Sequence, residues 1–271
     1  MFLLRLFDIK SQNDEDIHYG VYPRKEVNML PVPYNIIRND DLSDLDVTVW
    51  CFTKILSYNH NIESLLVSVA DLVYQMYGRL TVNHGITDGV GTSLRKLIKK
   101  EYIIATQVNN HSYAVNKDQY QQTNSEYEIY VDPADLRRIM QLPNHPAAVL
   151  RQYLFILSTI NTKTKCSMWS IPQLAEDLDK GEKTIMKQNG ELEELKLLYI
   201  YHAGNGRTTN TYGRYEDREA IERYGDFRTG GSKRKTTANY KRRMKQLANQ
   251  VAKGKQYDQN IMEELAEYVN G

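Results

Sequence analysis

The stretch Tyr153-Leu-Phe-Ile-Leu-Ser-Thr-Ile160 begins a pattern of segments that decides the fold of this chain of 271 residues. Its apolar residues are typical of a buried helix. A short helix is predicted next, at Ile171-Pro-Gln-Leu-Ala-Glu-Asp-Leu178, and a second helix ends with Leu192-Glu-Glu-Leu-Lys-Leu-Leu198. Two β-type runs around a polar turn complete the unit at Tyr215.

The same order of segments occurs earlier in the chain, up to Asn116. An apolar helix at Trp50–Leu56 precedes a short helix at Val69–Tyr74, a helix that ends at Leu94–Ile103, and two β-type runs. The duplicated order predicts two tandem winged helix-turn-helix domains, an architecture that commonly places one helix in a DNA major groove. The first unit has the longer turn, and glycines make it pliable. They are Gly78, Gly85, Gly89 and Gly91.

The pattern predicts an α+β fold that is mainly helical, with a helical extension at the C-terminus. We expect an N-terminal extension over residues 1–45, winged-helix domains over 46–125 and 126–226, and a basic, partly flexible helical region over 227–271. In the extension, Val32–Ile37 is interpreted as a strand. Ser43 or Asp46 is expected to cap the first domain helix, because either side chain offers an oxygen to free backbone amides.

Four further segments complete the predicted organisation. Residues 118–125 are rich in Gln and Asn and indicate a linker, and Tyr127–Val131 alternates like a strand. Asp132-Pro133 begins a short helix that reaches Met140. Near the C-terminus, Thr237–Lys253 and Asp258–Val269 have the period of amphipathic helices.

Charge is distributed unevenly along the chain. The formal net charge is only +1, yet residues 228–255 carry ten basic side chains and no acidic one. Such a segment is typical of phosphate contacts, although it could also be a solvated helix face or tail. Cys51 and Cys166 are expected to be buried, reduced thiols. The sequence has neither a signal peptide nor an apolar run of membrane-spanning length, so a cytoplasmic protein without a membrane partner is expected.

Candidate DNA-binding residues lie first on the predicted recognition helices. In the second unit, Thr and Lys side chains can reach phosphates, Lys can bind guanine, and Gln can pair with adenine. The residues are Lys183, Thr184, Lys187 and Gln188. In the first unit a positive outer face is predicted on a helix over Thr87–Lys99, with Thr87 or Asp88 as its cap. Its candidates are Thr92, Ser93, Arg95, Lys96 and Lys99.

Two further groups of candidate residues lie outside these helices. Arg207, at the tip of the second predicted hairpin, could enter a minor groove or could simply stand in a tight turn. The basic segment supplies the phosphate contacts predicted at Lys233, Arg234, Lys235, Lys241, Arg242 and Arg243.

Several segments of the second half carry a family resemblance. They are Glu128-Ile-Tyr-Val-Asp-Pro133, Arg151–Ile160, Leu197–Tyr201 and Asn210-Thr-Tyr-Gly-Arg-Tyr-Glu-Asp217. Together they resemble tandem winged-helix replication proteins of plasmids, phages and conjugative elements of low-GC Gram-positive bacteria. The likeness covers roughly residues 45–225. It implies an initiator that binds repeated sites at an origin and recruits a host helicase or helicase loader.

Other functions remain open at the level of the sequence. A transcriptional regulator or a conjugation accessory protein would make the same DNA contacts, as a monomer or a homodimer. A nickase or relaxase would use one of the tyrosines as its nucleophile. A protein-binding scaffold would neither bind DNA nor catalyse a reaction. No P-loop, Gly-x-Ser-x-Gly or metal-ligand spacing occurs, so we expect a non-enzymatic protein without cofactor or metal. Asn210–Tyr215 is interpreted as a turn packed on the second hairpin.

Overall fold

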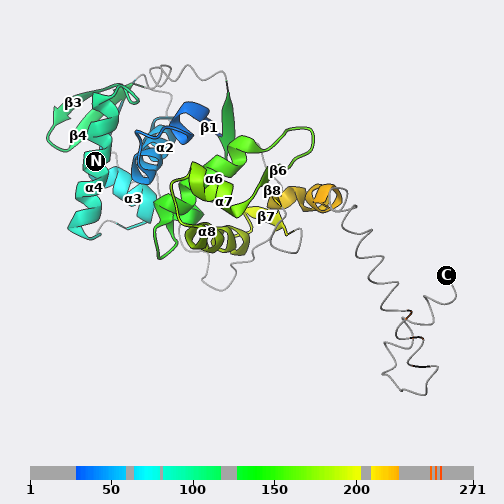
Figure 1. Cartoon of the computed structure of the whole chain (residues 1–271). Coiled ribbons are helices and arrows are strands. Elements are labelled where there is room, and N and C mark those ends of the chain that lie inside the picture. The colour runs from blue at the N-terminus through cyan, green and yellow to red at the C-terminus, as the bar shows by residue number, and fades with distance from the viewer. Residues whose placement is uncertain are drawn as a thin grey trace, which may run out of the picture.

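The computed structural model describes residues 29–58, 64–79, 82–116, 127–202 and 209–225, together with Lys245, Ala248 and Val251 (Figure 1). The candidates Arg207, Lys233, Arg234, Lys235, Lys241, Arg242 and Arg243 lie outside these residues. The predicted linker at 118–125 and the predicted helix at Asp258–Val269 also lie outside them. Of the predicted helix Thr237–Lys253, the three described residues are helical.

Two units of the chain have the same order of elements: helix, strand, helix, helix, strand, strand. The first unit consists of α2 (Asp44–Tyr58), β2 (Ser64–Ser68), α3 (Val69–Tyr77), α4 (His84–Lys99), β3 (Ala105–Asn109) and β4 (Ser112–Asn116). The second unit consists of α6 (Pro146–Thr159), β6 (Ser167–Trp169), α7 (Ile171–Asp177), α8 (Glu182–Glu194), β7 (Leu198–Tyr201) and β8 (Asn210–Arg214). The sequence predicts the helices and the final hairpins but not the strands β2 and β6.

The sheets of the two units have corresponding topologies. In each, the last strand lies in the middle and pairs antiparallel with the other two, in the orders β2-β4-β3 and β6-β8-β7. In the second unit, Tyr212 on β8 lies opposite Ser167 on β6 and Ile200 on β7. The predicted α+β fold is confirmed in its coarse form, as helices with small antiparallel sheets.

Local side-chain bonds explain where several helices begin. Ser68 and Asp71 form a reciprocal capping box before α3, and Ser170 and Gln173 form another before α7. At α2, the Ser43 backbone N–H donates to Asp46 Oδ2 (2.8 Å), and the Asp46 N–H donates to Ser43 Oγ (3.2 Å). Such boxes satisfy amides that the helix leaves free. The two cap candidates at Ser43 and Asp46 therefore act together.

Of the four glycines expected in the long turn, Gly78 lies there, as the left-handed C-cap of α3, while Gly85, Gly89 and Gly91 lie inside α4. Helix α4 begins at His84, with the Asn83 side chain accepting from Gly85 N–H, so Thr87 and Asp88 lie inside the helix and are not caps. A Cβ at position 89 would lie 3.3 Å from Leu45 Cδ2. Glycine therefore allows α4 to approach α2 closely.

Four further elements pack as a group against both units. Strand β1 (Leu30–Pro33) pairs antiparallel with β5 (Glu128–Val131), and the short helix α1 (Tyr34–Ile37) follows β1. Helix α5 (Pro133–Met140) agrees with the sequence prediction. The strand expected at Val32–Ile37 is wrong beyond Pro33, because Ile36 and Ile37 turn into the core as part of α1.

One hydrophobic core runs through both units. Helices α2 and α6 pack side by side at its centre (Figure 1). Arg151 on α6 is only 14% exposed and donates to the carbonyl oxygens of Ile37, Asn39 and Leu42. Its guanidinium also lies 3.7 Å from Asp44 Oδ1 at the start of α2. These bonds fix the second unit against the beginning of the first.

The run Asn210–Tyr215 is β8 and its continuation, which agrees with the second β-type run of the predicted hairpin and rules out the alternative of a turn packed on that hairpin. Tyr212 is fully buried on β8, and the Arg214 guanidinium donates to the Tyr130 carbonyl oxygen on β5. A Cβ at position 213 would lie 2.5 Å from Ile221 Cδ1, in the helical stretch 218–225. Only glycine permits that helical stretch to lie against the sheet.

Cys51 and Cys166 are buried free thiols, as predicted. None of the helices in the described part of the chain combines the length and apolar character that crossing a membrane requires.

Candidate nucleic-acid interface

Helix α8 presents a short polar row on its first two turns. Lys183, Thr184 and Lys187 are exposed, as predicted, while Ile185 and Leu192 are fully buried on the opposite side. Lys187 is 61% exposed, and its Nζ lies 3.7 Å from Glu191 Oε1. Because an exposed pair at this separation contributes little energy, Lys187 can leave Glu191 and reach a phosphate.

Gln188 does not lie on the outward face that the sequence predicts. Its side chain is 3% exposed, and that of Asn189 is 4% exposed. The helical period explains the error: position 188 follows Ile185 by three residues and precedes Leu192 by four, so it shares their face. Gln188 is therefore removed from the candidate groove residues.

A buried chain of hydrogen bonds holds α8 against the rest of the second unit. Gln152 Nε2 on α6 donates to Asn189 Oδ1 (2.7 Å), and Asn189 Nδ2 donates to the Tyr212 hydroxyl on β8 (3.2 Å). Buried polar groups need such partners, and each of these bonds favours the packing arrangement in which it forms. Asn189 thus orients the helix, while its lysines remain outside.

The N-terminus of α8 is a favourable place for an anion. Gly181 is the N-cap residue and has no side chain with which to cap the first amides. Free N–H groups and the helix dipole attract phosphates at such an end. Glu182 is exposed in the first turn and opposes part of this attraction. The positive charges of Lys183 and Lys187 follow within the next two turns.

Helix α4 exposes a second polar row, which carries two cations and one carboxylate. Asp88, Thr92, Arg95 and Lys99 are exposed at spacings of four, three and four residues, so they share one face. Arg95 Nη2 donates to Thr92 Oγ1 over 3.1 Å, which holds the guanidinium along the helix. Thr92, Arg95 and Lys99 therefore remain candidates.

Ser93 and Lys96 have a different environment from the outer face that the sequence predicts. Ser93 is 5% exposed, and Lys96 Nζ donates to Asp46 Oδ2 (2.6 Å) and to the Asp41 carbonyl oxygen (2.7 Å). Both side chains thus attach α4 to the start of α2. The main role of Ser93 and Lys96 is therefore structural, because a phosphate would have to compete with Asp46 for Lys96.

The carboxyl of Asp46 is held in its charged form. Burial by itself raises the pKa of this group, but hydrogen bonds from Lys96, Ser93 and Ser43 together lower the pKa below the ordinary 3.8. A charged acceptor that binds several donors is a strong local anchor. The positive charge of Lys96 is consequently neutralised within the protein.

The hairpin of the first unit has its turn at Asn110 and His111. The Asn109 side chain accepts from His111 N–H over 2.9 Å and stabilises the turn. The corresponding tip of the second unit, with Arg207, lies outside the described residues, and so do the six candidates of the basic segment.

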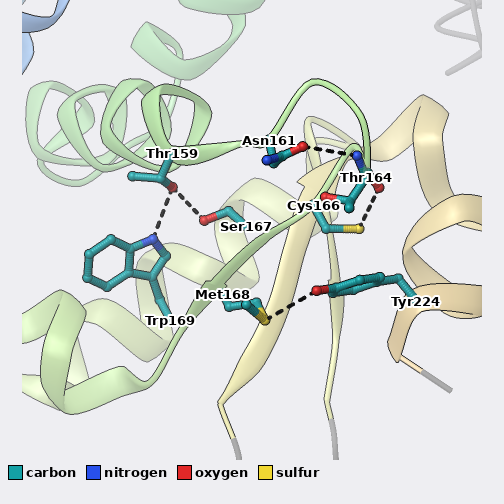
Figure 2. A pocket seen from close by; sticks show the side chains of 8 residues that line it. All are labelled: Thr159, Asn161, Thr164, Cys166, Ser167, Met168, Trp169 and Tyr224. Atoms are coloured by element: carbon teal, nitrogen blue, oxygen red, sulfur yellow. Dashed lines mark hydrogen bonds between the residues drawn. The ribbon is translucent and has the colours of Figure 1, made fainter. Parts of the chain in front are cut away.

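A pocket of about 270 Å³ lies beside the second sheet, between the turn after α6, β6 and Tyr224 (Figure 2). Its polar side chains bond mainly to neighbours. Trp169 Nε1 donates to Thr159 Oγ1 (3.0 Å), and Cys166 Sγ donates to the Thr164 carbonyl oxygen (3.0 Å). Such internal pairing leaves little with which to orient a small molecule.

The described tyrosines with shifted pKa values are poor nucleophiles. The pKa values of Tyr77, Tyr199 and Tyr212 are all raised, with burial as the largest cause in each case. A raised pKa makes the phenolate harder to form. Within the described ranges, no three His, Cys, Asp or Glu side chains gather as a metal site would require.

No protein-family model matches this sequence, and no curated protein matches it either.

Proposed function

We propose that this protein binds double-stranded DNA sequence-specifically through two winged-helix domains, which correspond to the two units. α4 and α8 act as the recognition helices. The observation that carries the proposal is the exposed row of Lys183, Thr184 and Lys187 at the uncapped start of α8. This helix is the third of its unit, the position from which a winged helix reads the major groove.

The division of each helix into two faces supports the proposal. On α8 the buried side anchors the helix through Gln152, Asn189 and Tyr212, so the lysines are held on a rigid support. On α4 Lys96 and Ser93 do the same through Asp46. Rigid support matters because side chains that read base edges must be held accurately in position. The basic segment 228–255 adds affinity that does not depend on sequence.

The biological role is proposed to be initiation of replication. The family resemblance stated above favours an origin-binding protein of a plasmid, phage or conjugative element that recruits a host helicase or helicase loader. In this role the protein has no catalytic activity of its own and works in the cytoplasm. Direct repeats next to the gene, protected from nuclease by the protein, are the expected footprint. Protection of a promoter alone would favour the transcriptional regulator instead.

The DNA-binding proposal is tested by measuring affinity as a function of salt. Fluorescence anisotropy with labelled duplexes is expected to show binding that weakens steeply as salt increases. Replacing Lys183 and Lys187 together by alanine should weaken binding and reduce the salt dependence by about two phosphate contacts. Lys163→Ala is the matched control, because Lys163 is exposed in the turn between α6 and β6, outside both recognition helices. Equal effects of the two variants would contradict the assignment of α8.

A further inference from the structure

The recognition helix α8 has an unusual distribution of polarity. It buries two amide side chains, Gln188 and Asn189, and exposes an apolar one, since Met186 is 54% exposed. A single exposed apolar side chain is ordinary on a protein surface. The position of this one is informative, because it lies on the helix face that we assign to DNA.

Met186 lies beside Lys183 on the exposed side of the helix. Lys183 precedes Met186 by three residues, so the two side chains are neighbours, while Lys187 lies about 100° around the helix from Met186, on the far side of Lys183. Gly190, four residues beyond Met186, extends the patch without adding bulk: a Cβ there would have no atom within 4 Å. A flat surface therefore continues past Met186, with the positive charges of Lys183 and Lys187 on one side of the thioether and Glu182 and Glu193 on the other.

The chemistry of this patch fits one feature of the major groove. The 5-methyl group of thymine is the apolar group that base edges present there, and apolar side chains read it by contact. Methionine is flexible and polarisable, so it can follow an apolar surface closely. The amides that could pair with adenine are buried, and the lysines serve phosphates or guanine. An apolar contact is therefore the remaining way for the middle of α8 to distinguish an A·T pair.

We propose that Met186 contacts the methyl group of a thymine and makes sequence recognition by the second unit depend on that methyl. This inference rests on the proposed DNA-binding function. The lysines favour DNA over a protein partner, because Lys183 and Lys187 can bind the phosphate backbone at one edge of the groove while the neighbouring Met186 contacts the base edges.

The test uses the full-length protein and a duplex selected from a random pool. Each thymine is replaced in turn by deoxyuridine, which removes the methyl group and preserves base pairing. At one or two positions we expect affinity to fall about fourfold, as for the loss of one buried methyl group. At these positions the Met186→Ala variant should bind the deoxyuridine duplex and the thymine duplex with the same affinity.

Met168→Ala is the matched control. Met168 is similarly exposed, at 46%, but lies on β6 beside the pocket in Figure 2. This variant should distinguish thymine from deoxyuridine as the unaltered protein does. Circular dichroism of both variants checks that the fold is kept, and alanine is favourable in a helix.

Three results would overturn the inference. If the unaltered protein binds every deoxyuridine duplex as tightly as the thymine duplex, the role of Met186 is overturned and the proposed DNA binding is not. The same holds if Met186→Ala still distinguishes thymine from deoxyuridine as the unaltered protein does. Absence of any salt-dependent DNA binding overturns the proposed function as well, and binding of α8 to a protein would then account for the exposed methionine.

Discussion

Lys96 Nζ lies 2.6 Å from Asp46 Oδ2, in a contact that attaches helix α4 to the capped start of α2. The Asp46 side chain is 3% exposed, so it depends on this cation and on its other donors. Replacing Lys96 by alanine should lower the free energy of unfolding by about 1–3 kcal/mol, because a nearly buried carboxylate loses a charged partner. Urea denaturation measures this loss.

The neighbouring Arg95 provides the control. Arg95 is exposed and bonds to Thr92 within the same helix. Arg95→Ala should change the free energy of unfolding by no more than about 0.5 kcal/mol, while it weakens DNA binding. A reversal of these effects, with Lys96 dispensable for stability and Arg95 essential, would contradict the division between structural and DNA-facing cations.

The charged state of Asp46 also predicts a dependence of stability on pH. The folded protein holds the pKa of Asp46 below the ordinary 3.8. Its contribution to stability is therefore present above that pH and is lost as the pH falls through the folded pKa. Asp46→Asn should be less stable than the unaltered protein at pH 7, and the difference should shrink below about pH 4. Urea midpoints between pH 7 and pH 3 measure the difference, and a constant difference would show that Asp46 does not titrate as described.

The buried amide network under α8 should be more important for stability than the exposed residues above it. Asn189→Ala leaves Gln152 Nε2 and the Tyr212 hydroxyl without this partner, in places sealed from water. We expect a loss of about 1–3 kcal/mol, because the bonds that remain, from Gln152 Nε2 to the Ile185 carbonyl oxygen (3.5 Å) and from Asn210 Nδ2 to the Tyr212 hydroxyl (3.4 Å), are long. Met186→Ala, on the exposed side of the same helix, should stay within about 0.5 kcal/mol. Similar denaturation midpoints for the two variants would refute the network's role.

The outcome at α8 shows how far a sequence can specify such a site. The apolar residues Ile185 and Leu192 set the buried face correctly, and Lys183, Thr184 and Lys187 follow as exposed. Residue type was misleading at Gln188, because an amide suggests exposure to solvent. Tertiary partners on α6 and β8 decide the burial of the amides, and these are distant in sequence.

The fold was predictable to a similar extent. Capping residues and apolar periods identify the helices, since both signals are local. Strands β2 and β6 have only five and three residues and gain their partners from β4 and β8, far along the chain. The pairing of β1 with β5, and the packing of α2 on α6, are also non-local. Such contacts leave no periodic pattern in the sequence.

The contacts of Arg151 predict that the two units unfold together. The Arg151 guanidinium donates hydrogen bonds to three carbonyl oxygens near the start of α2 and is largely buried. Arg151→Ala should cost about 3 kcal/mol, since it leaves three carbonyl oxygens without their charged donor and Asp44 with Lys180 as its remaining cation. The unaltered protein should show one cooperative transition by circular dichroism and by tryptophan fluorescence.

The control for Arg151 is Arg223→Ala. Arg223 is exposed and bonds only locally, to the Glu219 carbonyl oxygen. This variant should keep the stability of the unaltered protein to within about 0.5 kcal/mol. Two separate transitions in the unaltered protein would show that the shared core does not couple the units.

Selection of DNA sites from a random pool, followed by affinity measurement at several salt concentrations, tests the central claim most directly. We predict that the unaltered protein enriches a reproducible sequence and binds it with a steep salt dependence, and that the Lys183→Ala, Lys187→Ala double variant loses about tenfold or more in affinity, while Lys163→Ala does not. Failure to enrich any sequence, with no salt-dependent binding at all, would contradict the account.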